Sequence, residues 1–201
     1  TGGTDIEKIK TNMDGRCSTT LAAEAQRAAL NKAISFKKYE FDAHGVEMNQ
    51  RYSSNAVVTD GQMEPDFSLD ADLHYQPTTW PGARIPHVWL FDSQGGKYST
   101  LDLAGQGSFT IFTGLGGEAW KNAAKTISDR LGLSIKVHII GPRQKYIDHT
   151  GDWARAREIG DAGCIVTRPD QHVCWRHDGG HVDHTAELVR VFSAILAKQE
   201  E

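Results

Sequence analysis

Apolar side chains recur at helical spacing near the start of the chain. Within residues 19–41 these positions follow one another at intervals close to the helical repeat, with no proline or glycine among them, which predicts a helix. The positions that share this spacing are Leu21, Ala25, Ala28, Ala29, Ala33, Ile34 and Phe36. A helix this rich in alanine can pack closely against another element.

Glycine and proline punctuate residues 42–86, where only the run 56–59 has the composition of a strand. A structureless loop of that length is uncommon in a self-contained domain. We therefore expect this segment to lie across a neighbouring domain.

From residue 86 onward the pattern predicts alternating strands and helices. Strands are expected over 86–91, 97–103, 108–113 and 134–140, and helices over 118–131 and 153–159. A hairpin with strands over 164–168 and 172–176 and a closing helix over 182–198 complete the chain. The later elements follow the order of a thioredoxin-like fold, which is an α/β fold with a central mixed sheet flanked by helices.

Composition and charge exclude several classes of protein. The chain has 39 % hydrophobic and 24 % charged residues, which is typical of a globular protein. Its net charge of −4 contains no long run of either sign, so no nucleic-acid partner is expected. Neither a membrane span nor a signal-peptide pattern occurs, which favours a cytoplasmic protein with no membrane partner. A charged, helix-like stretch starts abruptly after Thr1, so we expect a larger polypeptide.

The cysteines do not indicate redox chemistry. Cys17, Cys164 and Cys174 are odd in number and widely spaced, which argues against a disulfide framework. Cys164 and Cys174 lie in apolar, strand-like runs, where a thiol packs as a small core residue. Redox-active thioredoxin-like domains carry Cys-x-x-Cys before the first core helix, but residues 113–118 read TGLGGE. Thiol–disulfide exchange is therefore not expected.

The glycine-rich turn over 114–117 has two interpretations. Glycines before a helix can cradle an anion on free backbone N–H groups. The turn lacks the lysine of a P-loop and the spacing of a dinucleotide fingerprint, and Glu118 would repel phosphate. A tight turn, with Glu118 favouring the start of the helix, is the preferred interpretation.

Residues 177–184 read HDGGHVDH and could recruit a metal. His177, His181 and His184, with Asp178 and Asp183, supply ligand types that suit zinc. The glycines favour a solvated loop instead, in which Asp183 or His184 caps the last helix. We assign no catalytic, cofactor-binding or metal-ligating residue to the chain.

Two groups of charged residues are interpreted as scaffold. In the hairpin, Asp170 can accept N–H bonds of the turn, and Arg168 and Arg176 lie at opposite ends. In residues 152–158, Arg155 or Arg157 is expected to pair with a carboxylate while the nearby tryptophan packs.

Several sequence strings resemble the carboxy-terminal part of FAD-dependent aromatic hydroxylases of the phenol hydroxylase and 2,4-dichlorophenol 6-monooxygenase family. The resemblance extends from about Leu21 to the end of the chain. The strings are YEFDAHGVEMNQRYSS (39–54), HYQPTTWPGARIPHVWL (74–90), STLDLAGQGSFTIFTG (99–114), GDWARAREI (151–159) and AGCIVTRPDQHVCWR (162–176).

The resemblance implies a parent enzyme with an FAD domain and a substrate domain ahead of this chain. In that parent, NADPH reduces the flavin and a phenolic substrate is hydroxylated at the ortho position. The dinucleotide fingerprint is absent here, so neither FAD nor NADPH is expected to bind this chain, and no catalytic residue is expected in it. The alternative is a stand-alone thioredoxin-like binding module without redox activity.

The same resemblance implies two parts. Residues 1–75 are expected to be a helical and irregular tail of the missing FAD domain, with helix 19–41 packed against it. Residues 76–201 are expected to form a thioredoxin-like domain that lacks the Cys-x-x-Cys site and supports homo-oligomer contacts or covers the active-site entrance.

Overall fold

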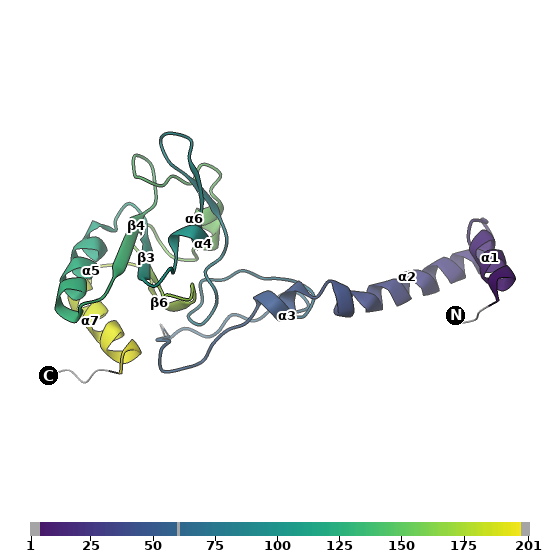
Figure 1. The fold of residues 1–201 in the computed structure, drawn as a ribbon, viewed down its shortest axis with the longest axis horizontal. Helices are drawn as coiled ribbons and strands as arrows, with labels where there is room; N and C mark the ends of the chain where they lie inside the picture. The colour runs from purple at the N-terminus through teal and green to yellow at the C-terminus, as the bar shows by residue number, and fades with distance from the viewer. Residues whose placement is uncertain (1–4, 60, 198–201) are drawn as a thin grey trace.

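A long helical arm projects from a packed body in the computed structural model, which describes residues 5–59 and 61–197 (Figure 1). The arm consists of α1 (Ile6–Gly15) and α2 (Leu21–Phe41), and α1 lies at its far end. Thr20 caps α2 by accepting a hydrogen bond from the Ala23 N–H at 3.3 Å. Both the predicted helix over 19–41 and the helix-like stretch before it are confirmed.

The segment between arm and body is largely irregular, as predicted, but it contains the short helix α3 (His44–Met48). The prediction missed this helix because five residues carry too little periodicity to be recognised. The Asn49 side chain holds the segment together by donating to the carbonyl oxygens of Ala71 and His74, each at 2.8 Å.

The body is built on a four-stranded mixed sheet in the order β4-β3-β5-β6. Its strands are β3 (Phe109–Thr113), β4 (Ile135–Ile139), β5 (Cys164–Thr167) and β6 (Val173–His177). β3 is parallel to β4 and antiparallel to β5, which is antiparallel to β6. A mixed sheet flanked by helices, and the predicted order of its elements, are therefore confirmed.

Two hydrophobic clusters cover the two faces of this sheet. On one face α5 (Glu118–Leu131) and α7 (His184–Ile195) pack against each other and against the sheet, with Trp120, Trp175 and Phe192 fully buried. The other cluster contains Phe112 and Trp153, the latter from α6 (Asp152–Ala156). Burial of such large apolar side chains supplies the main stabilising term of the fold.

The strand predicted over 97–103 is wrong beyond Ser99. The structure has a hairpin of β1 (Trp89–Phe91) and β2 (Lys97–Ser99), followed directly by α4 (Thr100–Leu103). The Ser99 hydroxyl accepts from the Leu101 N–H at 3.0 Å, and the Asp102 carboxylate accepts from the Ser99 N–H at 2.9 Å. This capping box starts a helix where hydrophobicity alone suggested a continuing strand.

Further bounds differ from the prediction, and the strand expected over 86–91 begins only at Trp89. Residues 56–59 form no strand; instead the Val58 N–H donates to the Cys174 carbonyl at 2.7 Å. α6 ends at Ala156 rather than at residue 159, because Glu158 adopts φ +54°, which is incompatible with a continuing helix. α7 begins at His184 and ends at Ile195, and Lys198 lies outside the described residues. No helix in the described ranges has both the length and the apolar character needed to cross a membrane.

His138 on β4 makes the stability of the fold sensitive to pH. Burial lowers the pKa of His138 to about 4, against the opposing effect of a hydrogen bond with the Leu103 carbonyl. Because its pKa is lower in the folded chain than in the unfolded chain, the unfolded state binds more protons between pH 6.5 and 4. Stability is therefore lost as the pH falls through this window.

We expect His138→Gln to remove this contribution. Between pH 7 and pH 5 the parent chain should lose roughly 2 kcal/mol more unfolding free energy than the variant. Urea unfolding at both pH values checks the difference. Equal pH dependence of the two proteins would show that His138 is not responsible.

Candidate functional site

The glycine turn over 114–117 is filled by the protein's own chain. A Cβ on Gly114 would lie 2.5 Å from the Asp161 carbonyl oxygen, and one on Gly116 would lie 2.7 Å from the Ala162 Cβ. Trp120 secures this approach by donating from Nε1 to the Ala162 carbonyl at 2.9 Å. The glycines thus allow residues 161–163 to pack on the turn, which supports the tight-turn interpretation over an anion cradle.

Gly114→Ala tests this packing. We expect a loss of about 1–3 kcal/mol of unfolding free energy, because the new methyl group meets backbone that cannot move away easily. Gly15→Ala is the matched control, since nothing lies closer than 3.9 Å to the Cβ built there. Chemical denaturation measures the unfolding free energy of both variants. Similar values for the two would contradict the packing role of Gly114.

The histidine-rich segment 177–184 is engaged in local structure. Asp183 caps α7 by accepting from the N–H groups of Thr185 and Ala186, each at 3.0 Å, which confirms its predicted capping role. His177 Nδ1 accepts from the Gly179 N–H, and the His184 ring lies 4.3 Å from the Trp120 ring, centroid to centroid. Within residues 5–59 and 61–197, no three His, Cys, Asp or Glu side chains are grouped to hold a metal ion.

The two strand cysteines are core residues, as predicted. Cys164 and Cys174 are completely buried, and burial raises the pKa of Cys174 to about 12. The pKa of Cys164 is raised as well, by burial first and by the neighbouring Cys174 second. Because a raised pKa keeps these thiols protonated, they are poor nucleophiles at neutral pH.

The predicted pairing of Arg155 or Arg157 with a carboxylate is confirmed, and the hairpin turn contains an ion pair as well. Arg168 pairs with Asp170, which also accepts the His172 N–H at 3.2 Å in the hairpin turn. Arg155 pairs with Asp152, whereas Arg157 pairs with Asp161 at 2.7 Å. Trp153 is buried and packs in the hydrophobic cluster that contains Phe112, in agreement with the predicted packing.

A polar cluster that the sequence pattern did not predict forms around Glu158. Glu158 Oε2 accepts hydrogen bonds from the Thr78 hydroxyl at 2.8 Å, the Thr79 N–H at 3.0 Å and the Thr79 hydroxyl at 3.1 Å. It also pairs with Arg176 Nη1 at 2.9 Å, and the Arg176 guanidinium lies 5.3 Å from the centre of the Trp80 ring. We call these residues the Glu158 clasp, because they fasten the segment 78–80 to β6.

Sequence reasoning missed the Glu158 clasp because Glu158 and its threonine partners lie about 80 positions apart. No local pattern encodes such a contact. The αL backbone of Glu158, which is uncommon for a residue other than glycine, is visible only in the structure.

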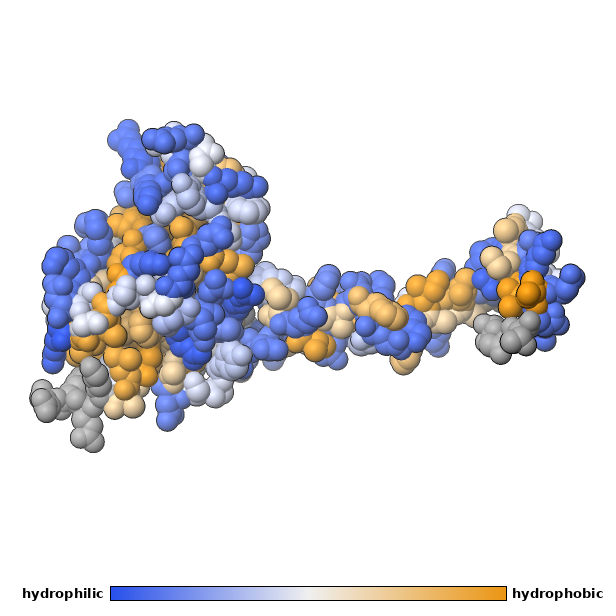
Figure 2. Space-filling model, viewed as in Figure 1, coloured by the Kyte–Doolittle hydropathy of each residue, from blue (hydrophilic) through white to orange (hydrophobic). Residues whose placement is uncertain are grey.

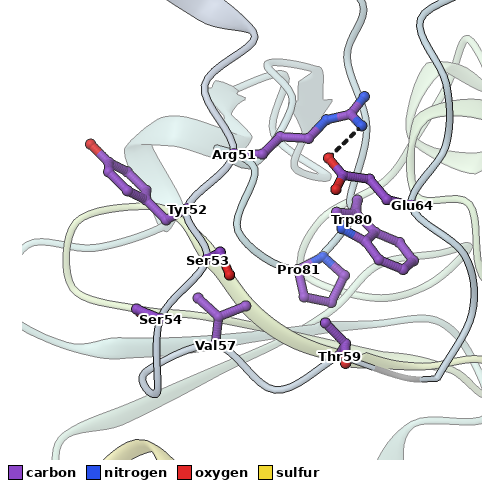
Figure 3. Close-up of a pocket in the computed structure, with 9 residues that line it drawn as sticks. All are labelled: Arg51, Tyr52, Ser53, Ser54, Val57, Thr59, Glu64, Trp80 and Pro81. Carbon is purple, nitrogen blue, oxygen red and sulfur yellow. Dashed lines mark hydrogen bonds and ion pairs between the residues drawn. The ribbon is translucent and has the colours of Figure 1, made fainter.

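The hollows on the described part of the body include three that are each smaller than a typical cofactor site. One of about 130 Å³ lies beside Trp80 and is lined by Ser53, Ser54 and Arg51, whose guanidinium pairs with Glu64 at 2.9 Å (Figure 3). The other two measure about 140 and 220 Å³. Sites for drug-sized ligands are typically about 300–1,000 Å³, so these hollows do not fit a flavin dinucleotide.

The arm has exposed apolar surface, seen as orange patches along α2 in Figure 2. At 3.6 residues per turn, Leu30, Ile34 and Phe41 lie on one side of α2, and Leu21, Phe36 and Tyr39 lie on the opposite side. Phe36 and Phe41 are 71 % and 84 % exposed. Exposed apolar surface on both sides of one helix marks an interaction site.

Comparison with known proteins gives a consistent result. The family model described as "Aromatic-ring hydroxylase, C-terminal" matches residues 78–198. The chain is 46 % identical to a 2,4-dichlorophenol 6-monooxygenase of Cupriavidus pinatubonensis, over 97 % of this chain and 33 % of the relative. It is also 46 % identical to a phenol 2-monooxygenase of Pseudomonas sp., over 84 % of this chain and 28 % of the relative.

A solved structure has a similar fold. The flavin-dependent monooxygenase PieE, in complex with FAD and substrate, matches with a TM-score of 0.80 and 39 % identity, over 93 % of this chain and 32 % of that protein. The chain thus spans about a third of the length of the proteins it matches.

Proposed function

This chain belongs to the aromatic-ring hydroxylase C-terminal family, and on that premise we propose that it is the structural carboxy-terminal domain of a flavin-dependent phenol hydroxylase. In this proposal α1 and α2 pack against the flavin and substrate domains of the same polypeptide. The names of the two relatives, which act on dichlorophenol and phenol, support a phenolic or chlorophenolic substrate hydroxylated at the ortho position.

The observation that carries the proposal is the pair of apolar faces on α2. A helix that is apolar on opposite sides is stable in water only when both sides are covered. The body covers neither side, since among the side chains of α2 only Ala23 is buried. The chain spans about a third of the length of its relatives, so a protein of the relatives' length has enough additional polypeptide to cover both sides of α2.

The catalytic chemistry belongs to the remainder of the polypeptide. FAD supplies oxygen activation and NADPH supplies the reducing equivalents. The glycine turn of this chain is filled by residues 161–163, which supports this division of roles. In this proposal its contribution is to hold the arm in position relative to the body. The Asn49 hydrogen bonds within the connecting segment and the Glu158 clasp, which fastens the end of that segment to β6, support this role.

The finer assignments belong to the same proposal. Residues 1–75 are the part associated with the preceding domain, and residues 76–201 form a thioredoxin-like domain. The strand order β4-β3-β5-β6, with only β3 and β4 parallel, supports that label, because a thioredoxin-like core pairs its first two strands in parallel. A homo-oligomer held by the body and a cytoplasmic location complete the proposal.

Charged substitutions on the two faces of α2 test the role of the arm. In a polypeptide of the relatives' length, Ile34→Glu and Phe36→Glu should each lower stability by about 3 kcal/mol and reduce the bound FAD, because each places a carboxylate in an apolar contact. Asn31→Glu introduces the same group on the polar side of α2 and should have little effect.

The same three variants of the 201-residue chain supply the second arm of the experiment. All three should unfold like the parent chain, because positions 34 and 36 are exposed there. If the variants behave alike in both lengths of protein, the arm has no partner in the polypeptide. The stand-alone binding module is then the better account.

A further inference from the structure

The two edges of the sheet differ in how far other backbone segments cover them. The edge at β6 is covered by residues 82–85, where the Gly82 N–H donates to the Val173 carbonyl at 2.7 Å and the Val173 N–H donates to the Ala83 carbonyl at 2.8 Å. Val58 extends this cover to Cys174. No segment of the described structure pairs with the full length of β4 at the other edge.

The ladder shows which backbone groups of β4 point outward. The Phe109 N–H donates to the Ser134 carbonyl at 3.0 Å, and the Ile140 N–H donates to the Thr113 carbonyl at 2.8 Å. In a parallel pair, alternate residues bond to the same neighbour, so the even-numbered residues of β4 face β3. Ile135 and Val137 therefore direct N–H and C=O groups away from the sheet, and no partner for them occurs in the described ranges.

A small hollow with basic residues lies along this edge. It measures about 140 Å³, and Val137 and Ile139 provide its apolar wall. Lys121 and Lys145 also line it, and Lys136 lies on β4 itself. Lys121 is 55 % exposed and paired with Glu118 at 3.0 Å, an arrangement that a competing carboxylate can replace at little cost.

We infer that β4 docks an extended, acidic segment of another protein, which joins the sheet as a fifth strand. Outward N–H and C=O groups would bond its backbone, and the lysines would pair with its carboxylates, as in peptide recognition by strand addition. A second copy of this chain is a poor occupant, because pairing β4 with β4 brings like-charged lysines together. The arm leaves the body on the side away from β4 and α5 (Figure 1).

A labelled hexapeptide of alternating glutamate and valine is the probe, titrated into the 201-residue chain with fluorescence anisotropy as the readout. We expect saturable binding that weakens as salt is added, and much weaker binding of a lysine–valine hexapeptide. In amide exchange, the N–H groups of Ile135 and Val137 should be fast without peptide and slow with it. Those of Lys136 and His138 should be slow throughout.

Two variants distinguish the contribution of the β4 backbone to peptide binding from the contribution of the lysine charges. Val137→Pro removes an outward N–H without removing a bond to β3, and Lys121→Glu with Lys145→Glu reverses the rim charge. Each should weaken binding by about tenfold. The pair Lys8→Glu and Lys32→Glu makes the same change in net charge on the arm, and should bind like the parent chain.

Three results would overturn the inference. They are equal binding of the acidic and basic peptides, unchanged binding by both β4 variants, and outward amides already protected in the peptide-free chain. The last, together with a doubled mass in sedimentation, would assign the edge to a second copy.

Discussion

Replacing Trp120 with alanine is expected to lower the free energy of unfolding by about 3–5 kcal/mol. Its ring is completely buried between α5, α7 and the sheet, and it contacts the ring of Trp175 with centroids 5.7 Å apart. The substitution leaves a cavity at this point. It also leaves the Ala162 carbonyl without the N–H donor that holds residues 161–163 on the glycine turn.

Urea unfolding followed by circular dichroism measures this loss. Trp89→Ala is the matched control, because the same atoms are removed from a side chain that is 42 % exposed and lies on the β1–β2 hairpin. Its expected cost is about 1 kcal/mol, from lost contacts with Lys97 and His87. Comparable losses in the two variants would contradict the assignment of Trp120 to the centre of the core.

Glu158→Gln is expected to cost about 2 kcal/mol, because the Arg176 side chain is buried whereas the Glu158 side chain is 37 % exposed. The change removes the carboxylate oxygen that lies 2.9 Å from the buried guanidinium of Arg176. It also weakens the hydrogen bonds that Thr78 and Thr79 donate, so amide exchange should increase over residues 78–80.

A double substitution distinguishes the clasp from a general loss of charge. Adding Arg176→Met to Glu158→Gln also removes the buried guanidinium, so the double variant should be more stable than the sum of the single changes predicts. Glu187→Gln, which breaks the exposed pair with Arg190 at 2.9 Å, should cost no more than about 0.5 kcal/mol. Strict additivity, or a similar cost for Glu187→Gln, would contradict the role of the clasp.

The elements that the sequence predicts well are those whose apolar face is buried by the domain itself. α5 begins at Glu118 and ends at Leu131, as predicted, because Trp120 and Ile127 mark its buried side and Gly132 ends it with φ +66°. The hairpin of β5 and β6 is confirmed for the same reason, since Ile165 and Trp175 are buried in regular strands.

The misplaced elements are those fixed by polar contacts rather than by periodicity. The hydroxyl of Ser99 caps α4 where the pattern predicts a continuing strand. The positive φ of Glu158 ends α6 early, and the Glu158 side chain accepts a hydrogen bond from the Thr79 N–H. Hydrophobic patterning carries no information about either contact. The candidate interaction surface could be predicted only in part. The sequence indicates that α2 is rich in small apolar residues, but only the structure shows that both of its sides are exposed.

The central claim is that the preceding domains cover the arm, and amide hydrogen exchange over α2 tests it most directly. The measurement compares residues 30–41 in the 201-residue chain and in a polypeptide of the relatives' length that carries it. We expect rapid exchange in the short chain, where the side chains of α2 other than Ala23 stay outside the core, and strong protection in the long one. Equal exchange in both would contradict the account, because the apolar faces of α2 would then have no partner in the same polypeptide.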